Sequence, residues 1–288
     1  MDTKHSIPVA LIGVTGYTGM ELTRLLASHP VFELTLVTSR QEADKRLDSI
    51  YPQLQGEKIG SLIIEPPSAE KIAQDCQLAF LAVPHGTAMD MAAQLLDMGV
   101  KVVDFSADFR LQDAEVYKHW YGLEHRHKDL LPQAVYGLIE LAEEQIPTAE
   151  LIANPGCYPS SIILGLYPAL AAGVIDPGQI IVDSKSGASG AGRKASTGTL
   201  FCEVYDNFRA YNLGKHRHTP EIEQELGRIC GQEITISFNP HLLPIDRGIL
   251  STIYTTCRDD ISEERIRDIY TEYFGTNPWI RILPPGVL

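Results

Sequence analysis

Near its N-terminus the chain carries an apolar run that leads into a glycine-rich turn, Ile7-Pro8-Val9-Ala10-Leu11-Ile12-Gly13-Val14-Thr15-Gly16-Tyr17-Thr18-Gly19. Residues 20–26 then place apolar side chains at helical spacing. A strand, a glycine turn and a helix in this order are typical of the loop that holds a dinucleotide pyrophosphate. Because the spacing is GxxGxxG rather than GxGxxG, a turn that binds no ligand remains an alternative. The candidate cofactor contacts in this turn are Gly13, Thr15, Gly16, Tyr17, Thr18 and Gly19.

Strand and helix patterns continue to alternate as far as residue 104. Apolar runs predict strands at 32–37, 78–83 and 100–104, and helical spacing over 87–98 ends at Gly99. Residues 45–60 are irregular and predict a loop. Such alternation is typical of a parallel sheet with helices on both faces. We therefore expect a doubly wound, Rossmann-type domain over residues 1–150.

The end of the second predicted strand indicates which dinucleotide is bound. Thr38-Ser39-Arg40 stands where an NAD site usually has an acidic residue for the ribose 2′-hydroxyl. An arginine at this place accommodates the 2′-phosphate of NADP instead. Ser39 and Arg40 therefore predict NADP, with a solvated loop arginine as the alternative.

Polar residues follow the predicted strand at 100–104. Open α/β sheets bind ligands beyond the carboxyl ends of their strands, and Arg110 lies six residues past this end. Its guanidinium is suited to hold a carboxylate or phosphate by two hydrogen bonds. A salt bridge from Arg110 to Asp108 or Asp113 is an equally good interpretation.

From about residue 151 the pattern changes. Strands are predicted at 180–186, 234–238 and 249–257, and a helix at 262–274. Strands joined by long loops, with helices on one side, predict an α+β domain over residues 151–288 with a mostly antiparallel sheet. The free face of that sheet would serve substrate binding or dimer formation. Residues 187–194 form a glycine-rich loop, and the basic residues Lys185, Arg193 and Lys194 favour an anion site over a merely flexible connection.

A cysteine stands at the predicted start of a helix, in Ile152-Ala153-Asn154-Pro155-Gly156-Cys157-Tyr158-Pro159. Unpaired N–H groups and the helix dipole at such a position favour the thiolate, which is the nucleophilic form. We place Pro159 at the first helical position, where its missing N–H costs nothing. Cys157 is therefore the candidate nucleophile, and a buried structural cysteine is the alternative.

Two histidines precede another predicted helix, in Lys215-His216-Arg217-His218-Thr219-Pro220-Glu221. Thr219 as N-cap and Pro220 at the first helical position mark the helix start. Histidines on the preceding loop are well placed as acid/base groups. A solvated basic cluster is the alternative. A metal site is disfavoured, because no carboxylate stands at helical ligand spacing to them.

Composition limits the partners and the compartment. The net charge of −13 argues against a nucleic-acid surface or an anionic membrane. Five widely spaced cysteines without metal-like spacing fit a reducing cytosol better than a disulfide framework. Residues 1–5 show no targeting character, and no window approaches the length of a membrane span. We expect a cytoplasmic protein that acts on a small molecule.

Four motifs together resemble the N-acetyl-gamma-glutamyl-phosphate reductases of arginine biosynthesis. They are Gly13-Val14-Thr15-Gly16-Tyr17-Thr18-Gly19, Asn154-Pro155-Gly156-Cys157-Tyr158-Pro159, Ser186-Gly187-Ala188-Ser189-Gly190-Ala191-Gly192-Arg193 and His216-Arg217-His218-Thr219-Pro220-Glu221. The likeness spans nearly the whole chain. Family members continue beyond this point through a further strand and a terminal helix, so the resemblance implies a C-terminally shortened form.

The resemblance also implies roles for individual residues. It implies Cys157 as nucleophile and His218 as acid/base. It implies that Ser39 and Arg40 contact the NADP 2′-phosphate, with Ser186 and Gly187 as further cofactor contacts. The substrate-cleft residues that it implies are Arg110, Asn154, His216 and His241. A homo-oligomer, either dimer or tetramer, is expected.

The implied reaction reduces an acyl phosphate to an aldehyde with NADPH through a cysteine thioester. Aspartate-semialdehyde dehydrogenase uses the same chemistry, but the Asn154–Pro159 motif fits the N-acetylglutamyl group better. The sequence alone poorly distinguishes this reaction from the reduction of aminoadipyl phosphate bound to a carrier protein. A non-catalytic NADP-sensing protein is an alternative from a different class.

Overall fold

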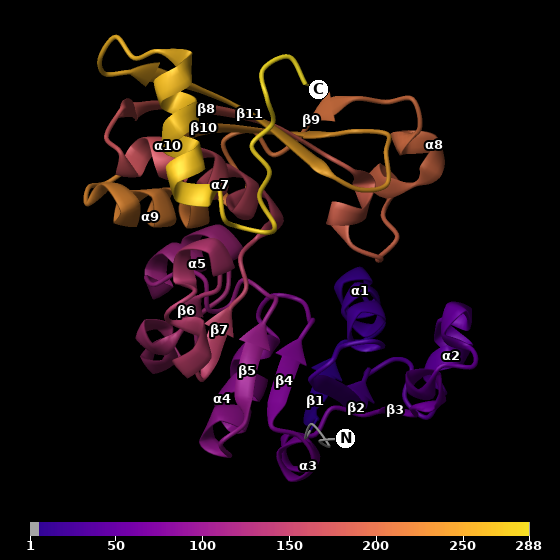
Figure 1. The fold of residues 1–288 in the computed structure, drawn as a ribbon. Helices are drawn as coiled ribbons and strands as arrows, with labels where there is room; N and C mark the ends of the chain where they lie inside the picture. Colours follow the sequence, from indigo (N-terminus) through magenta and orange to yellow (C-terminus); the bar gives the residue numbers. More distant parts are fainter. Residues whose placement is uncertain (1–5, 288) are drawn as a thin grey trace. The chain divides into compact units, whose positions relative to one another are not determined.

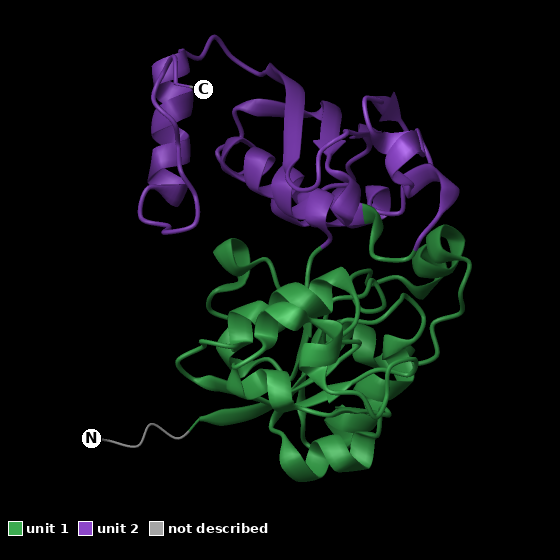
Figure 2. Cartoon of the chain, turned by 90° about the vertical axis from the view of Figure 1, so that its right-hand side faces the viewer, with its two compact units in different colours: residues 1–155, 191–194 green, residues 156–190, 195–288 purple. Residues whose placement is uncertain are grey.

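The computed structural model of the protein describes residues 6–287. Residues 1–5, in which the sequence shows no targeting character, and Leu288 lie outside the described residues. The chain divides into two compact units (Figure 2). Unit 1 holds residues 1–155 and 191–194, and unit 2 holds residues 156–190 and 195–288.

Unit 1 is built on a seven-stranded sheet of order β3-β2-β1-β4-β5-β7-β6, in which every pairing is parallel (Figure 1). Helices connect the strands, as a parallel sheet requires. In chain order its elements are β1 (Ile7–Ile12), α1 (Tyr17–Leu26), β2 (Phe32–Thr38), α2 (Leu47–Ile50), β3 (Ile64–Glu65), α3 (Ala69–Asp75), β4 (Leu78–Leu81), α4 (Ala88–Asp97), β5 (Lys101–Asp104), α5 (Ala114–Tyr121), β6 (Val135–Tyr136), α6 (Ile139–Ala142) and β7 (Leu151–Ala153). Four 3-10 turns, Pro52–Leu54, Lys58–Ser61, Lys128–Gln133 and Ile146–Thr148, complete it.

Alternate residues of the central strand enter two separate cores. Val9 and Leu11 of β1 pack in one core with Leu26 of α1, whereas Ala10 and Ile12 pack in the other with residues of α3 and α4. Successive side chains of a strand point to opposite faces, so both faces of this sheet are covered. The doubly wound sheet predicted from the sequence is confirmed.

The strand order reverses direction beside β1. Its neighbours are β2 on one side and β4 on the other, so the loops that follow β1 and β4 leave the same edge of the sheet in opposite directions. The start of the β4 loop is tied to β1, because the Ala82 N–H donates to the Ile12 carbonyl at 2.8 Å. Ligands of open α/β sheets bind at such a switch point.

The end of unit 1 differs from the predicted boundary. β7 pairs with β5 and β6 inside the seven-stranded sheet, so the sheet continues past residue 150 to Ala153. An apolar run predicts a strand, but it does not show which other strands that strand pairs with. The irregular segment 45–60 contains α2 and two 3-10 turns rather than only loop.

Unit 2 contains a four-stranded sheet of order β11-β8-β10-β9. β8 pairs parallel with β10, while the β8–β11 and β9–β10 pairings are antiparallel. The mostly antiparallel α+β domain is thus confirmed. Its elements are α7 (Cys157–Ala171), β8 (Ile175–Ser186), α8 (Phe201–Val204), β9 (Arg209–Ala210), α9 (Thr219–Cys230), β10 (Ile236–Leu242), β11 (Ile249–Cys257) and α10 (Glu263–Phe274), with 3-10 turns at Ala188–Ala191, in the loop shared by the two units, and at Thr197–Thr199.

Helix α7 covers one face of this sheet. The Ser161 hydroxyl of α7 donates to Ser251 of β11 at 2.6 Å, and Val182 on the same face of β8 is fully buried. Tyr270 of α10 in turn donates its hydroxyl proton to the Gly165 carbonyl of α7 at 2.5 Å. None of the helices in residues 6–287 combines the length and hydropathy needed to span a bilayer.

Candidate active site

The three glycines of the turn after β1 serve different purposes. Gly13 has φ +86°, and a Cβ there would lie 2.3 Å from the Ala82 carbonyl oxygen. A Cβ on Gly19 would lie 2.6 Å from the carbonyl oxygens of Gly13 and Val14. At Gly16 the nearest described atom would be 3.8 Å away, so packing does not explain this glycine. Close approach of a phosphate to the backbone does explain it, and the turn therefore fits a dinucleotide.

Alanine substitutions should separate packing from binding. Gly13→Ala should lower the free energy of unfolding by about 2 kcal/mol or more, because the side chain meets backbone at a positive φ. Gly16→Ala should change stability by less than about 0.5 kcal/mol, since φ −77° and ψ 167° suit alanine. It should nevertheless raise the Kd for NADPH about tenfold or more by blocking the phosphate. Urea unfolding measures the stability of each variant, and fluorescence titration measures its Kd for NADPH. Equal losses of stability in Gly13→Ala and Gly16→Ala would contradict the distinction between a packing glycine and a binding glycine.

The end of β2 brings two hydroxyl groups beside the turn. Ser39 is buried, and its Oγ lies 3.4 Å from Thr15 Oγ1. The Ser39 hydroxyl also accepts the N–H groups of Gln41 and Glu42 at 3.3 and 3.4 Å, which shapes the turn after the strand. Arg40 is exposed. Two hydroxyls and a cation suit a phosphate, whereas a ribose 2′-hydroxyl is usually bound by an acidic side chain at this place.

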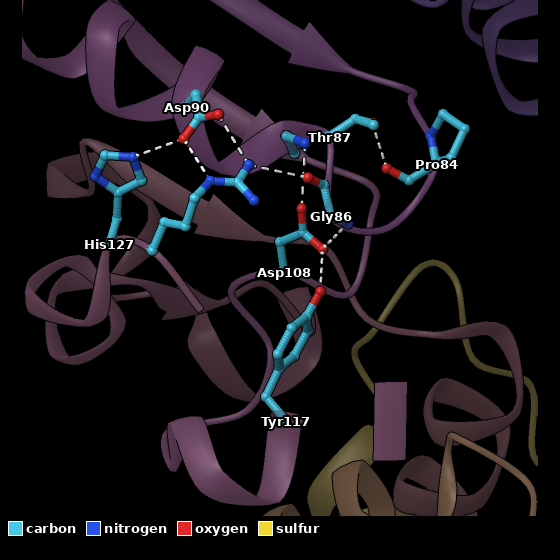
Figure 3. Close-up of polar contacts among 9 residues, drawn as sticks. Pro84, Gly86, Thr87, Asp90, Asp108, Tyr117 and His127 are labelled. Atoms are coloured by element: carbon cyan, nitrogen blue, oxygen red, sulfur yellow. Dashed lines mark hydrogen bonds and ion pairs between the residues drawn. The ribbon is translucent and has the colours of Figure 1, made fainter. Parts of the chain in front are cut away.

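The loop after β4 is held by a buried carboxylate (Figure 3). Asp108 accepts the Gly86 N–H and the Tyr117 hydroxyl on Oδ1, at 2.7 and 2.8 Å, and the Ala88 N–H on Oδ2, at 3.1 Å. Burial and the nearby Asp108 charge raise the pKa of Tyr117, so the phenol remains a donor. Asp108 thus fixes the loop that leaves the switch point beside the glycine turn.

Arg110 and Asn154 lie together in unit 1. Arg110 is 5% exposed, and it donates from Nε to the Asn154 carbonyl at 2.7 Å and from Nη2 to the Phe105 carbonyl at 2.9 Å. These contacts hold the chain after β5 to the chain after β7. Neither carbonyl partner was anticipated, because sequence shows which residues are basic but not which backbone groups they meet. Whether Arg110 also binds substrate stays a prediction.

Cys157 is the first residue of α7 and is exposed. Gly156 is the N-cap, and its N–H donates to Oε1 of the buried Glu221 at 2.7 Å. The helix begins two residues earlier than we expected, so Pro159 is its third residue, still within the turn whose N–H groups lack intrahelical partners. The buried-cysteine alternative is therefore excluded.

His216 and His218 stand at the start of α9 within an aromatic cluster. Their ring centroids are 4.9 Å apart, and Tyr158, next to Cys157, lies 5.3 Å from His216 and 6.0 Å from His218. Nδ1 of His216 accepts the His218 N–H at 3.1 Å, which fixes the turn. Helix α9 begins at Thr219, with His218 rather than Thr219 as its N-cap residue.

Burial and the neighbouring Arg217 lower the pKa of His216 to about 4. Since an unfolded histidine titrates near 6.5, the unfolded chain takes up a proton between about pH 6.5 and 4 while the folded chain does not. The contribution of His216 to the free energy of unfolding is therefore fully present above about pH 6.5, and it is lost as the pH falls from about 6.5 to 4.

The variant His216→Asn, which keeps an acceptor near the position of Nδ1, should remove this pH dependence. Between pH 8 and pH 5 the natural protein should lose about 2 kcal/mol more unfolding free energy than the variant. Urea unfolding at both pH values measures the difference. If both proteins lose the same unfolding free energy between pH 8 and pH 5, the pKa of His216 is not lowered in the folded protein.

Two tyrosines join the cysteine and histidine segments. The hydroxyls of Tyr158 and Tyr211 lie 2.9 Å apart. Burial raises the pKa of both, and negative charge on Cys157 raises each further, so both phenols lie near the thiol. The Tyr158 hydroxyl also donates to the His241 carbonyl at 3.5 Å. The sequence offered no signal for Tyr211, which stands 53 residues from its partner.

The remaining cofactor candidates lie in unit 2, where Ser186 ends β8 and Gly187 follows it. Ser186 is buried, and a Cβ on Gly187 would lie 2.5 Å from the Asp246 carbonyl oxygen. Packing against the loop between β10 and β11 thus suffices to explain this glycine. Within residues 6–287 no group of three histidine, cysteine or acidic side chains is arranged to hold a metal ion.

Family profiles cover almost the whole chain. The profile described as "Semialdehyde dehydrogenase, NAD binding domain" matches residues 8–149, and "Semialdehyde dehydrogenase, dimerisation domain" matches residues 157–288. A curated relative from Desulfotalea psychrophila, named N-acetyl-gamma-glutamyl-phosphate reductase, is 54% identical over 97% of this chain and 80% of its own length. One of the same name from Pelotomaculum thermopropionicum is 48% identical over 98% of this chain and 81% of its own.

The chain belongs to the N-acetyl-gamma-glutamyl-phosphate reductase family. The family that the four sequence motifs predicted is thereby confirmed. Solved structures of more distant proteins share the fold: a probable aspartate-semialdehyde dehydrogenase from Pseudomonas aeruginosa has a TM-score of 0.68 at 18% identity, covering 98% of this chain and 83% of its own. Aspartate semialdehyde dehydrogenase II from Vibrio cholerae gives 0.66 at 17%, covering 94% and 80%.

Proposed function

We propose that the protein reduces N-acetyl-glutamyl 5-phosphate to N-acetyl-glutamate 5-semialdehyde with NADPH, in arginine biosynthesis. The observation that carries the proposal is the exposed cysteine at the first residue of α7, in a chain about half identical to named reductases. An exposed thiol at a helix N-terminus has the access and the local field that a nucleophile needs. A cytoplasmic location fits such a biosynthetic role.

Cys157 is the nucleophile of the first step. Its thiolate forms a bond to the acyl carbon, the bond from that carbon to the phosphate oxygen breaks, and inorganic phosphate leaves with the electron pair. The product is a thioester on Cys157. Phosphate is a good leaving group, so this step needs no strong acid, and covalent capture divides one difficult reduction into two easier ones.

His218 serves the second step. When bound, NADPH supplies the hydride that reduces the thioester carbon. His218 donates a proton to the oxyanion that develops there and takes it back as the thiohemiacetal collapses to the aldehyde and the Cys157 thiolate. The histidine's place beside Tyr158 in the aromatic cluster supports this role, because Tyr158 adjoins the nucleophile.

NADP is favoured over NAD by the groups at the end of β2. Thr15, Ser39 and Arg40 offer two hydroxyls and a cation beside the glycine turn. These groups would hold the 2′-phosphate, while the turn at Gly16 would hold the diphosphate.

The partner proposed for the open face of unit 2's sheet is a second copy of this chain. Ile181 of β8 stands directly opposite Tyr254 of β11, and with Leu250 they are 48, 55 and 65% exposed on the face that α7 does not cover. An apolar face of this kind is typical of a protein interface. The matching dimerisation-domain profile supports a homodimer through it. Sedimentation equilibrium at micromolar concentration tests this; a monomer would contradict it.

One titration tests the proposed activity. NADPH oxidation is followed at 340 nm with N-acetyl-glutamyl phosphate, with aspartyl phosphate and with carrier-bound aminoadipyl phosphate. We expect turnover with the first to exceed the others at least a hundredfold. NADPH binding without turnover of any acyl phosphate would favour a sensing protein, and iodoacetamide labelling across pH would then show whether Cys157 is reactive.

A further inference from the structure

The glycine-rich loop after β8 returns to the dinucleotide turn. Residues 191–194 belong to unit 1, although the chain on both sides of them belongs to unit 2 (Figure 2). Within this segment Arg193 donates from Nη1 to the Thr15 carbonyl at 3.0 Å. This hydrogen bond joins residues 178 positions apart and places a cation on the glycine turn, which lies within the residues that match the NAD binding domain profile.

Tyr51 supports the arginine. The Arg193 guanidinium lies over the Tyr51 ring, 5.7 Å from its centroid, which is a cation–π distance. The Tyr51 hydroxyl donates to the Val14 carbonyl at 2.9 Å. Two consecutive carbonyls of the turn, those of Val14 and Thr15, therefore accept hydrogen bonds from one stacked pair of side chains.

The guanidinium keeps capacity for a ligand. Arg193 is exposed, and its partners are the Thr15 carbonyl and Tyr51, with no carboxylate of residues 6–287 paired to it. A guanidinium carries five N–H donors, and these two partners leave others available to anionic oxygens. In a chain of net charge −13, an uncompensated cation at this place favours an anion.

We propose that Arg193 binds a phosphate of the dinucleotide and holds segment 191–194 against the glycine turn. The inference rests on the proposed function, because it assumes that NADPH binds at this turn. The ligand chemistry is a phosphate oxygen, which either the diphosphate or the 2′-phosphate can provide. Arg193 is a binding residue here, and it takes no part in the steps at Cys157.

The variant Arg193→Met, which keeps the length of the side chain without its charge, tests the proposal. Its Kd for NADPH, measured by fluorescence titration without substrate, should rise about 10- to 100-fold. Removing one cation from a phosphate contact should also make log Kd depend less steeply on log salt concentration. KM for NADPH should rise with kcat nearly unchanged. Arg24→Met, which removes an exposed charge from the last turn of α1 in the same unit, is the matched control and should change Kd less than about threefold.

NADH and NADPH together locate the phosphate. Equal losses for the two in Arg193→Met indicate the diphosphate, and a loss confined to NADPH indicates the 2′-phosphate; both support the proposal. An unchanged Kd for both dinucleotides would overturn the proposal. So would a higher Kd with an unaltered salt dependence, because Arg193 would then act only through its hydrogen bond to the Thr15 carbonyl. Failure of the natural protein to bind either dinucleotide would instead refute the proposed function. Arg193→Lys, which restores the charge, should recover part of the affinity.

Discussion

Cys157→Ser should lower kcat for acyl-phosphate-dependent NADPH oxidation at least about 1000-fold. A serine hydroxyl at the start of α7 stays protonated at neutral pH, whereas a thiol at a helix N-terminus ionises readily. Without the thiolate no thioester forms, and the direct reduction of an acyl phosphate has no covalent intermediate to lower its barrier. NADPH binding should change little, because the diphosphate is expected to contact the backbone of the glycine turn after β1, which the substitution does not alter.

The measurement pairs steady-state assays with a single-turnover experiment. Natural protein mixed with acyl phosphate in the absence of NADPH should release about one equivalent of phosphate and gain the acyl mass on Cys157, and the variant should do neither. Cys202→Ser, at another exposed cysteine of unit 2, is the matched control and should retain activity. If the Cys157 variant keeps its turnover within tenfold, the thioester route is wrong.

Local features of both units were predictable where short-range sequence determines them. Strand β1 was predicted with its observed bounds, Ile7–Ile12, since an apolar run ending at glycine leaves few alternatives. The position of Cys157 at the start of a helix was also predicted from neighbouring residues, those of the motif Asn154–Pro159. The start of β8 at Ile175 was missed by five residues, because Pro177 and Gly178 within the strand are typical of a turn. Ile175 nevertheless pairs with Cys257 of β11, so the strand continues across a register shift that contains Pro177 and Gly178.

Contacts between distant segments could not be predicted. Arg110 was a candidate for binding a carboxylate or phosphate, and the structure shows it donating to the backbone carbonyls of Phe105 and Asn154, which carry no sequence signature. Arg193 was noted as basic, but only the fold brings it to Thr15. Residue type determines what a side chain can bind, and tertiary structure determines which groups it meets. Candidate sites read from sequence are therefore more reliable in their chemistry than in their partners.

His218→Gln should lower kcat for NADPH oxidation about 100-fold or more, since it removes the proposed acid and leaves an amide of similar size. Unlike Cys157→Ser, it should still release one equivalent of phosphate before stalling, because departure of phosphate needs no strong acid. The acyl group should then accumulate on Cys157, where intact-protein mass spectrometry detects it.

The pattern of the two variants separates an acid/base role for His218 from a structural one. Added imidazole should restore part of the turnover of His218→Gln, because a diffusible acid can reach a half-buried position that has lost its ring. His119→Gln, on the exposed surface of α5, should leave both the phosphate burst and kcat unchanged. If His218→Gln abolishes the burst as well, the histidine is needed to form the thioester rather than to protonate the oxyanion that hydride transfer creates. If neither the burst nor kcat changes, His218 has no part in the chemistry, and the acid must be sought among the other groups near Tyr158.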